Sequence, residues 1–564
     1  MFRKSNKDRQ LDVFSSVTSQ LESTAYKQYS DQGHWHNQFR EQISLRIDES
    51  IFSVLFNNNM GAPNAPIRIL VAMMILKESF GWSDSQLFEH CRFNLLMRSA
   101  LGLFNMNDSL PVESTYYLFR KRIYDYQKQN GIDLMENVFG QITSEQIKEF
   151  EVNGSRIRMD SKLIGSNIAV FSRYEIIHHT LCMFFNSLDI HTKTKLQITD
   201  LEQLTKLTKE ESNKTVYRST KEDIKNRLKP IGILIYKMLK LYGDLKTDLF
   251  YLLKRVFDEQ YKVSEEGQIE LRPKEKISSS SVQSPHDPDS AFRSKGNQKI
   301  KGYSVNVTET CSNDGLNLIT NVIVDKANKA DTAFVKPAIK ATIKITDQSI
   351  KKVFADGAYH SPANDDICKN IDMIFTGIQG AKSRYDLEMT PEGLMVTDTY
   401  TGEQMKAVLV KKRKNNKEDR WRIKTPNGYY YFGQQAIRAS RIRHKMKGRS
   451  LEEMRKRNNV EATIFQLSCT LRNNKSKYRS LIKQKMWTCC RCLWINLVRI
   501  INFSRQTCLK TAAMAEKLAI LTFSSLLLTI WQRAIRKIND CGNQLFITVS
   551  FNLSNSFYKF LRLI

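Results

Sequence analysis

The spacing of apolar residues changes several times along the chain, and these changes limit how it can fold. Up to about residue 150, apolar side chains recur at intervals of three and four, and 66–80 (PIRILVAMMILKESF) is almost wholly apolar. This spacing predicts several short helices, one of them buried. Exposed Arg and Lys residues fit a helix-turn-helix-like DNA-binding domain, and an all-α packing domain fits the same spacing equally well.

From residue 152 onward the pattern becomes that of strands. In RIRMDSK, Ile157 and Met159 alternate with Arg158 and Asp160, which predicts a strand with one apolar and one polar face. Helical spacing returns after this strand and ends in a Ser- and Pro-rich loop, KEKISSSSVQSPHDPDS. Two further strand patterns and a β-α-β pattern follow the loop. Together they predict an α/β core with a mixed sheet and helices packed on it.

The pattern of apolar residues changes again in the later part of the chain. Strand patterns with turns at Thr401-Gly402 and Asn427-Gly428 predict a β-rich insert, and the chain after it is helical and basic. The predicted domains are a helical N-terminal domain at 1–150, a core at 151–380 with a helical insertion at about 170–290, the β-rich insert at 381–440, a helical C-terminal region at 441–535 and an atypical tail at 536–564.

The charge of the chain is strongly positive. It contains 87 Lys+Arg against 58 Asp+Glu, a net charge of +29. Such an excess favours a polyanionic partner, with nucleic acid first and an anionic membrane second. We expect no membrane partner, since the most apolar stretch, 518–531, is shorter than a spanning helix and contains Ser and Thr. The N-terminus lacks a secretory signal and the cysteines lack disulfide-scaffold spacing, which predicts a cytoplasmic protein.

Three acidic residues share a suggestive context. Asp160 lies near the end of the first strand, and Asp356 ends the short apolar strand of VFADGAYHSP, before a helix that Ser361-Pro362 would start. Glu461 lies on a helix predicted over 451–472, beside an apolar stripe. Each residue also has a simpler explanation, such as a turn aspartate for Asp356 or an i,i+4 surface ion pair for Glu461.

Carboxylates that converge from separate elements suit a divalent cation. Oxygen ligands of this kind are the ones that Mg²⁺ and Mn²⁺ prefer. Two ions held about 4 Å apart can activate a water or a 3′-hydroxyl for phosphodiester chemistry. If Asp160, Asp356 and Glu461 meet, they therefore predict a metal-dependent nuclease or strand-transfer site.

Several blocks of this sequence resemble those of bacterial insertion-sequence transposases of the DDE class, from the group with a β-rich insert before the catalytic Glu. They are RMDSK, KGYSVNV, VFADGAYHSP, RNNVEATIFQLSCTLRNN and, nearer the N-terminus, GAPNAPIRILVAMMILKESFGWSDSQLFE. The resemblance covers roughly residues 35–500. It implies an RNase H-like fold and a DNA-binding N-terminal domain. It also implies that Asp160, Asp356 and Glu461 are both catalytic and metal-binding, with Mg²⁺, or alternatively Mn²⁺, as cofactor.

The resemblance also implies a reaction and partners. Such enzymes hydrolyse DNA at the terminal inverted repeats of the element and use the freed 3′-hydroxyls to attack target DNA. They generally act as a synaptic assembly, so we expect a homodimer with DNA, in the bacterial cytoplasm and associated with the nucleoid. Two alternatives stay open. One is a catalytically inactive DNA-binding protein, such as a decayed transposase or a repressor, and the other is a nuclease that cuts without joining.

Around the glutamate, related transposases carry a Tyr-x2-Arg-x3-Glu-x6-Lys pattern that this sequence keeps only in part. Arg457 and Glu461 stand at the arginine and glutamate positions, but Met454 and Ser468 replace the tyrosine and the lysine. Arg472, one turn beyond Ser468 if the helix continues, is a candidate for the missing phosphate contact.

The insert and its flanks supply the remaining DNA-binding candidates. Trp421, between Arg420 and Arg422, could stack on an unpaired base, although cross-strand packing is the commoner role for an aromatic residue in a hairpin. Two basic runs are candidates for phosphate contacts, with a solvated charged surface as the alternative. The residues predicted to make these contacts are Lys411, Lys412, Arg413, Arg441 and Arg443.

Overall fold

The computed structural model describes residues 1–5, 15–57, 61–313, 315–376, 384–410, 419–426 and 428–540. Two compact units divide the chain, Met1–Arg499 and Ile500–Ile564. All elements described below belong to the first unit, except the part of the last helix that follows Arg499.

The N-terminal part is helical, as predicted. Helix α3 is buried nearly all round, as its apolar sequence indicated, and it ends at Gly81 in the left-handed conformation (φ 69°). The helices are α1 (Ser23–Ser30), α2 (Trp35–Gln42), α3 (Ile67–Phe80), α4 (Asp84–Phe93), α5 (Leu95–Ala100), α6 (Glu113–Asn130) and α7 (Leu134–Glu149), with 3-10 turns η1 (Val17–Gln20), η2 (Ser44–Arg46) and η3 (Glu49–Leu55).

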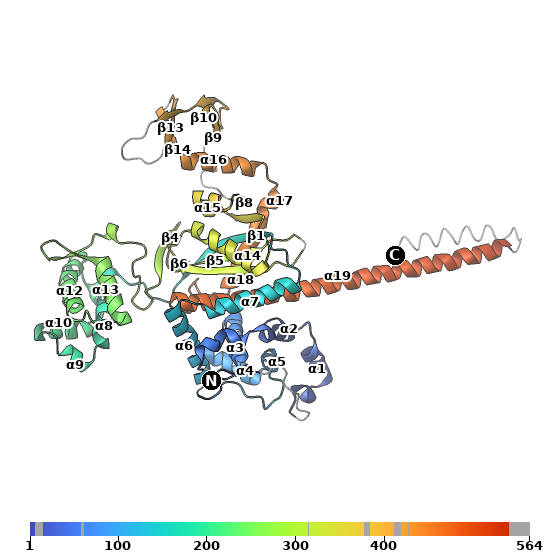
Figure 1. Cartoon of the computed structure of the whole chain (residues 1–564), viewed down its shortest axis with the longest axis horizontal. Helices are drawn as coiled ribbons and strands as arrows, with labels where there is room; N and C mark the ends of the chain where they lie inside the picture. Colours follow the sequence, from blue (N-terminus) through green and yellow to red (C-terminus); the bar gives the residue numbers. More distant parts are fainter. Residues whose placement is uncertain are drawn as a thin grey trace. The chain divides into compact units, whose positions relative to one another are not determined.

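A six-stranded mixed sheet forms the centre of the first unit (Figure 1). Its strands are β1 (Arg156–Gly165), β4 (Ala291–Lys295), β5 (Gln298–Thr310), β6 (Ile319–Lys326), β7 (Lys352–Asp356) and β8 (Asp372–Thr376). Strand β1 pairs antiparallel with β5 and parallel with β7, and β7 pairs parallel with β8. Strands β4 and β6 share the other edge of β5. The predicted α/β class with a mixed sheet agrees with this architecture.

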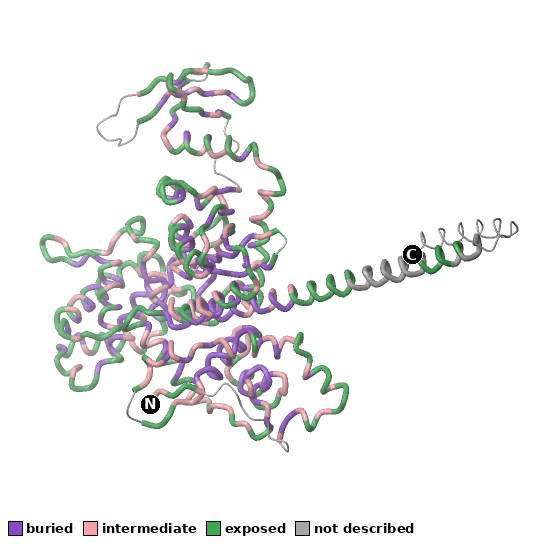
Figure 2. Tube along the Cα trace, turned by 45° about the vertical axis from the view of Figure 1, so that its right-hand side comes forward, coloured by how far each residue is buried: buried purple, intermediate pink, exposed green. Residues whose placement is uncertain are grey.

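Helices cover the sheet and complete its core. Helix α14 (Val335–Thr346) packs on β6 and α7, and α15 (Pro362–Ile367) follows β7 through the 3-10 turn η6 (Gly357–Tyr359), with a second turn, η5 (Asp331–Phe334), before α14. Helix α15 begins as predicted, because Ser361 accepts a hydrogen bond from the Asn364 N–H and Pro362 takes the first helical position. Buried residues gather in the sheet and in the helices that pack on it (Figure 2).

A helical insertion separates β1 from β4 and has a hydrophobic core of its own. Its amphipathic helices enclose Phe184, Leu253 and Val256, which are almost fully buried. The elements are α8 (Arg173–Ser187), α9 (Ile190–Lys193), α10 (Ile198–Thr208), α11 (Ser212–Arg218), α12 (Lys221–Leu241) and α13 (Asp248–Gln260), a hairpin of β2 (Tyr261–Val263) and β3 (Ile269–Leu271), and the turn η4 (Lys274–Lys276).

The β-rich insert contains two three-stranded sheets. They are built from β9 (Tyr385–Thr390), β10 (Gly393–Asp398), β11 (Gln404–Lys406), β12 (Val408–Val410), β13 (Arg420–Thr425) and β14 (Gly428–Gly433). The chain then returns toward the sheet through α16 (Gln434–Lys447), α17 (Leu451–Arg455), the turn η7 (Lys456–Asn458) and α18 (Asn459–Ser468), and ends in α19 (Leu481–Asp540).

Helix α19 contains the cysteine-rich CCRC segment. Cys489, Cys490 and Cys492 are buried, and burial raises the pKa of Cys492 to about 12, so this thiol stays neutral at physiological pH. Neutral buried thiols are poor zinc ligands.

Across the residues that the structure describes, no helix combines the length and apolar character needed to cross a membrane.

Candidate active site

Asp160 and Asp356 end up on neighbouring parallel strands at the same level of the sheet. The β1–β7 register pairs Arg158 with Phe354, and two further residues along each strand bring Asp160 level with Asp356. Residues that are level in a parallel pair point to the same face. The negative charge of Asp356 also contributes to the raised pKa of Asp160. Two of the three predicted acids are therefore neighbours.

The third acid, Glu461, is linked to Asp160 through Arg457. The Arg457 guanidinium donates from Nη2 to Asp160 Oδ2 (2.7 Å) and lies 3.1 Å, through Nη1, from Glu461 Oε1. Arg457 lies in η7 and is mostly buried, with 14% of its side chain exposed, whereas Glu461 is 59% exposed. One guanidinium thus bridges two of the predicted catalytic acids. The i,i+4 pair expected from the sequence is present, but it is part of a tertiary contact with β1.

The environment of Asp160 disfavours its charge. Burial raises the pKa of Asp160 above its ordinary value, and this effect exceeds the lowering by Arg457 and by the hydrogen bond from the Ser161 N–H. The neighbouring Asp356 carboxylate raises the pKa further. A carboxylate in this position is stabilised by a cation, and Arg457 supplies one.

The donor chemistry of the three acids fits a hard divalent cation. Asp160, Asp356 and Glu461 present only carboxylate oxygens. In this conformation, no three His, Cys, Asp or Glu side chains within the described ranges are arranged to hold a metal ion. Arg457 contacts the carboxylates of Asp160 and Glu461 instead, and its own Nε is buried without a hydrogen-bond partner.

A buried polar network fixes α18 on the sheet. Glu309 of β5 is fully buried, forms ion pairs with Arg158 and Arg499, and accepts a hydrogen bond from Thr463 of α18 (2.6 Å). Arg158 also donates to the main-chain carbonyl of Lys456 (3.3 Å). The polar face predicted for the first strand is therefore covered by the segment that carries Glu461. The sequence showed the polar face but not what covers it.

The helix that carries Glu461 is shorter than predicted. The range 451–472 divides into α17, η7 and α18, and α18 ends at Ser468. Asn473 and Asn474 both have positive φ (51° and 55°) and form a turn in which the Lys475 N–H donates to the Arg472 carbonyl. Asparagine tolerates this left-handed conformation, so the turn ends the helical direction. The expectation that Arg472 continues the polar line of the helix was wrong.

The position of the missing lysine has an unexpected neighbour. Lys162, two residues beyond Asp160 and on the same face of β1, donates from Nζ to Ser468 Oγ (2.7 Å). Ser468 is itself buried and also donates to the carbonyl of Ile464 (2.9 Å). The ammonium group of Lys162 therefore lies beside Ser468, although Lys162 belongs to a strand about 300 residues earlier in the chain.

In the insert, the structure shows the packed alternative for Trp421. Its side chain is 9% exposed and lies in the insert core, opposite Phe432 in the β13–β14 register. Stacking on a base would require it to leave that core. Arg420 is exposed, and the Arg422 guanidinium lies 5.0 Å from the centre of the Tyr429 ring.

The two basic runs have different outcomes. Lys411, Lys412 and Arg413 lie outside the described residues. Arg441 is exposed on α16, whereas Arg443 is largely buried and lies 3.8 Å from Asp386 Oδ1 of β9. Arg441 is thus available to a phosphate, and Arg443 already has an acidic partner.

Comparison with known protein families gives one match. Residues 24–122, which span α1 to the middle of α6, match the family model described as "Transposase domain (DUF772)". This match supports the prediction that the chain is a transposase. No curated protein and no solved structure matches the chain.

The transposase domain is joined to the Glu461 helix through Arg491. This residue of α19 is 3% exposed and donates to the main-chain carbonyls at the C-terminal ends of two helices. At the end of α3 the acceptors are Glu78 and Ser79 (3.2 and 2.7 Å), and at the end of α18 they are Gln466 and Leu467 (3.3 Å for Leu467). Carbonyls at a helix C-terminus lack partners within the helix, and a cation satisfies them.

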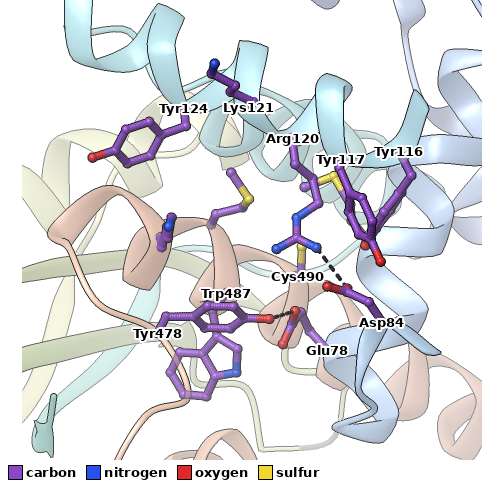
Figure 3. Close-up of a pocket in the computed structure, with 13 residues that line it drawn as sticks. Glu78, Asp84, Tyr116, Tyr117, Arg120, Lys121, Tyr124, Tyr478, Trp487 and Cys490 are labelled. Atoms are coloured by element: carbon purple, nitrogen blue, oxygen red, sulfur yellow. Dashed lines mark hydrogen bonds and ion pairs between the residues drawn. The ribbon is translucent and has the colours of Figure 1, made fainter. Parts of the chain in front are cut away.

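A cavity of about 250 Å³ lies beside this junction (Figure 3). Asp84 forms ion pairs with Lys77 (2.7 Å) and Arg120 (2.8 Å), and Glu78 accepts a hydrogen bond from Tyr478. Burial raises the pKa of Glu78, while Lys77 and Arg120 hold the pKa of Asp84 below its ordinary value despite its partial burial. Every acid that lines this cavity therefore has a partner within the protein.

Proposed function

We propose that this chain is a DDE transposase in which Asp160, Asp356 and Glu461 are the catalytic, metal-binding acids. The observations that carry the proposal are that strand register brings Asp160 level with Asp356, and that Arg457 contacts both Asp160 and Glu461 of α18. The transposase domain at residues 24–122 gives independent support. The i,i+4 ion pair of Arg457 with Glu461 does not by itself explain the contact of Arg457 with Asp160 of β1.

We further propose an RNase H-like core. The strand order β6-β5-β1-β7-β8, antiparallel on one side of β1 and parallel on the other, supports it. The acids lie on the two central parallel strands and on a helix that packs against β1. Such an arrangement gives carboxylates rigid positions at one face of the sheet.

The chemistry of the site follows from its charges. Mg²⁺ or Mn²⁺ bound by the three acids would supply Lewis-acid activation of a water or 3′-hydroxyl and charge stabilisation of the leaving oxygen. The chain itself contributes the half-buried positions of Asp160 and Asp356, where electrostatic contacts are stronger than in bulk water. Arg457 balances the negative charge and, from the same position, can contact a phosphate oxygen.

The partners proposed are DNA at the terminal inverted repeats, target DNA and a second copy of the chain in the synaptic complex. The net charge of +29 supports a nucleic-acid partner. Arg420 and Arg441 are exposed and therefore available to phosphates. Arg472, although outside α18, is also exposed.

The deciding experiment is cleavage of labelled duplex that carries the inverted repeats flanking the gene, in Mg²⁺ or Mn²⁺. We expect metal-dependent nicking at the repeat boundary by the wild type, loss of nicking in Asp356→Asn, and wild-type nicking in Asp366→Asn, a control that removes an exposed acid of α15. End binding without cleavage in either metal would contradict the proposal in favour of an inactive DNA-binding protein. Cleavage without joined products would restrict the proposed activity to that of a nuclease.

A further inference from the structure

A groove of about 930 Å³ runs beside α18, starting one turn beyond Glu461. Its lining comes from the end of β1, the β4–β5 hairpin, α18 and the Asn473-Asn474 turn. The lining residues are Lys162, Gly165, Ser166, Ile168, Val170, Phe292, Gln298, Lys299, Ile300, Lys301, Phe465, Ser468, Cys469, Leu471, Asn473, Asn474 and Lys475. The groove contacts the proposed active site through Lys162, which shares a face of β1 with Asp160.

The charge of this groove is one-sided. Four lysines line it, and none of the described lining residues is an aspartate or glutamate. Three of the lysines donate only to neutral oxygens: Lys162 to Ser468 Oγ (2.7 Å), Lys301 to the Phe171 carbonyl (3.3 Å) and Lys475 to the Ile168 carbonyl (3.5 Å). Within the described part of the chain, none of the four forms an ion pair. Lys162 and Lys301 are half-buried, whereas Lys299 and Lys475 are exposed. Four ammonium groups without acidic partners, two of them partly desolvated, favour an anionic ligand.

Burial makes a similar point for Lys301, which is half-buried. It lowers the pKa of Lys301, and the charge of Glu175 offsets this effect only in part. A phosphate bound beside Lys301 would stabilise its charged form.

An aromatic residue stands at the edge of the groove. Phe465 is 71% exposed and follows Glu461 by four residues, so both point outward from the same face of α18. Phe292, half-buried on β4, also lines the groove. Large exposed aromatics beside lysines are the combination that binds unpaired bases and their phosphates. From Glu461 to Ser468 the helix rises about 10 Å, which is a few nucleotides of strand.

We propose that this groove binds a single DNA strand that leaves the cleaved phosphodiester, with its phosphates on Lys162, Lys299, Lys301 and Lys475 and a base stacked on Phe465. The inference rests on the proposed function, because it takes the neighbouring acids to be the cleavage site. It goes further by naming the strand path, the contact residues and Lys162 as the cation that occupies position 468.

The test measures binding alone, without divalent metal, by fluorescence anisotropy. Two probes are compared, a blunt inverted-repeat duplex and the same duplex with a short single-stranded extension carrying 2-aminopurine. We expect the wild type to prefer the extended duplex by roughly tenfold, the contribution of about one stacked base, and to quench the 2-aminopurine. Phe465→Ala and Lys162→Met should remove most of the preference, and Phe465→Ala should also remove the quenching.

Lys246→Ala, an exposed lysine of the helical insertion, is the matched control and should keep the preference. Because Lys162 is partly buried, its variant is compared at a temperature below its unfolding transition, and exposed Phe465 gives an independent result. Equal binding of both probes by the wild type, or an unchanged preference in Phe465→Ala and Lys162→Met, would overturn the inference. Failure of cleavage alone would overturn only the proposed function, since this assay needs no cleavage.

Discussion

The groove beside α18 and the cavity of Figure 3 both hold buried or half-buried charges, but they balance them differently. In the cavity, Asp84 is paired with Lys77 and Arg120, and Glu78 with Tyr478. In the groove, four lysines face no acid among the described lining residues. Charges matched within the protein stabilise the junction of the transposase domain with α19, whereas unmatched charges leave binding energy for a ligand.

The largest expected effect concerns that junction. Arg491→Met should destabilise the first unit by about 3–5 kcal/mol, because four helix-end carbonyls of α3 and α18 lose their donor, at about 1 kcal/mol each. Thermal and urea unfolding would measure it. Arg491→Lys keeps the charge with fewer donors and should fall in between. An unchanged transition in Arg491→Met would show that the junction does not depend on this residue.

A smaller effect is expected when the cavity is made to resemble the groove. Asp84→Asn leaves Lys77 and Arg120 without this acid and should cost about 1–3 kcal/mol. Since the folded-state pKa of Asp84 lies below its ordinary value of 3.8, its contribution is present above that pH and is lost as pH falls through the lowered pKa. Acid unfolding should therefore be less steep in the variant. A stability loss that is the same at acid and neutral pH would contradict the assignment.

The reverse change makes the groove resemble the cavity. Ser468→Asp would give Lys162 an acidic partner and should weaken binding of the extended DNA probe roughly tenfold. Anisotropy at two salt concentrations measures the effect, with Ser468→Asn as the uncharged control. Unaltered affinity in Ser468→Asp would argue that the DNA does not pass Lys162.

The smallest expected effect is a change in pH dependence at Glu78. Burial raises its folded-state pKa, so its contribution is fully present below its ordinary value of 4.5 and is lost as pH rises through the raised pKa. Glu78→Gln should remove this loss, a difference of at most about 1.4 kcal/mol per pH unit. Unfolding midpoints from pH 4 to 8 would measure it. A variant whose midpoints keep the wild-type pH dependence would show that Glu78 is not the group that titrates.

Much of the local structure could be predicted from the sequence, because local spacing controls it. The strand ending at Asp356, the Ser361 cap and the buried helix α3 all follow from residues within a few positions of each other. The helix expected over 451–472 was wrong at its C-terminal end, where two asparagines adopt left-handed backbone. Their turn is docked on β1, as Asn474 donates to the Leu163 carbonyl (2.8 Å), a contact that helical spacing cannot indicate.

By itself, the sequence determined the element types, the excess of positive charge and three acids worth testing. Only the tertiary structure decided which charges meet: Arg457 with Asp160, Lys162 with Ser468, and Arg491 with the ends of two helices. These partners are separated by up to several hundred residues. Their meeting depends on strand register and helix docking, which the packing of the whole core sets, so no short stretch of chain encodes it.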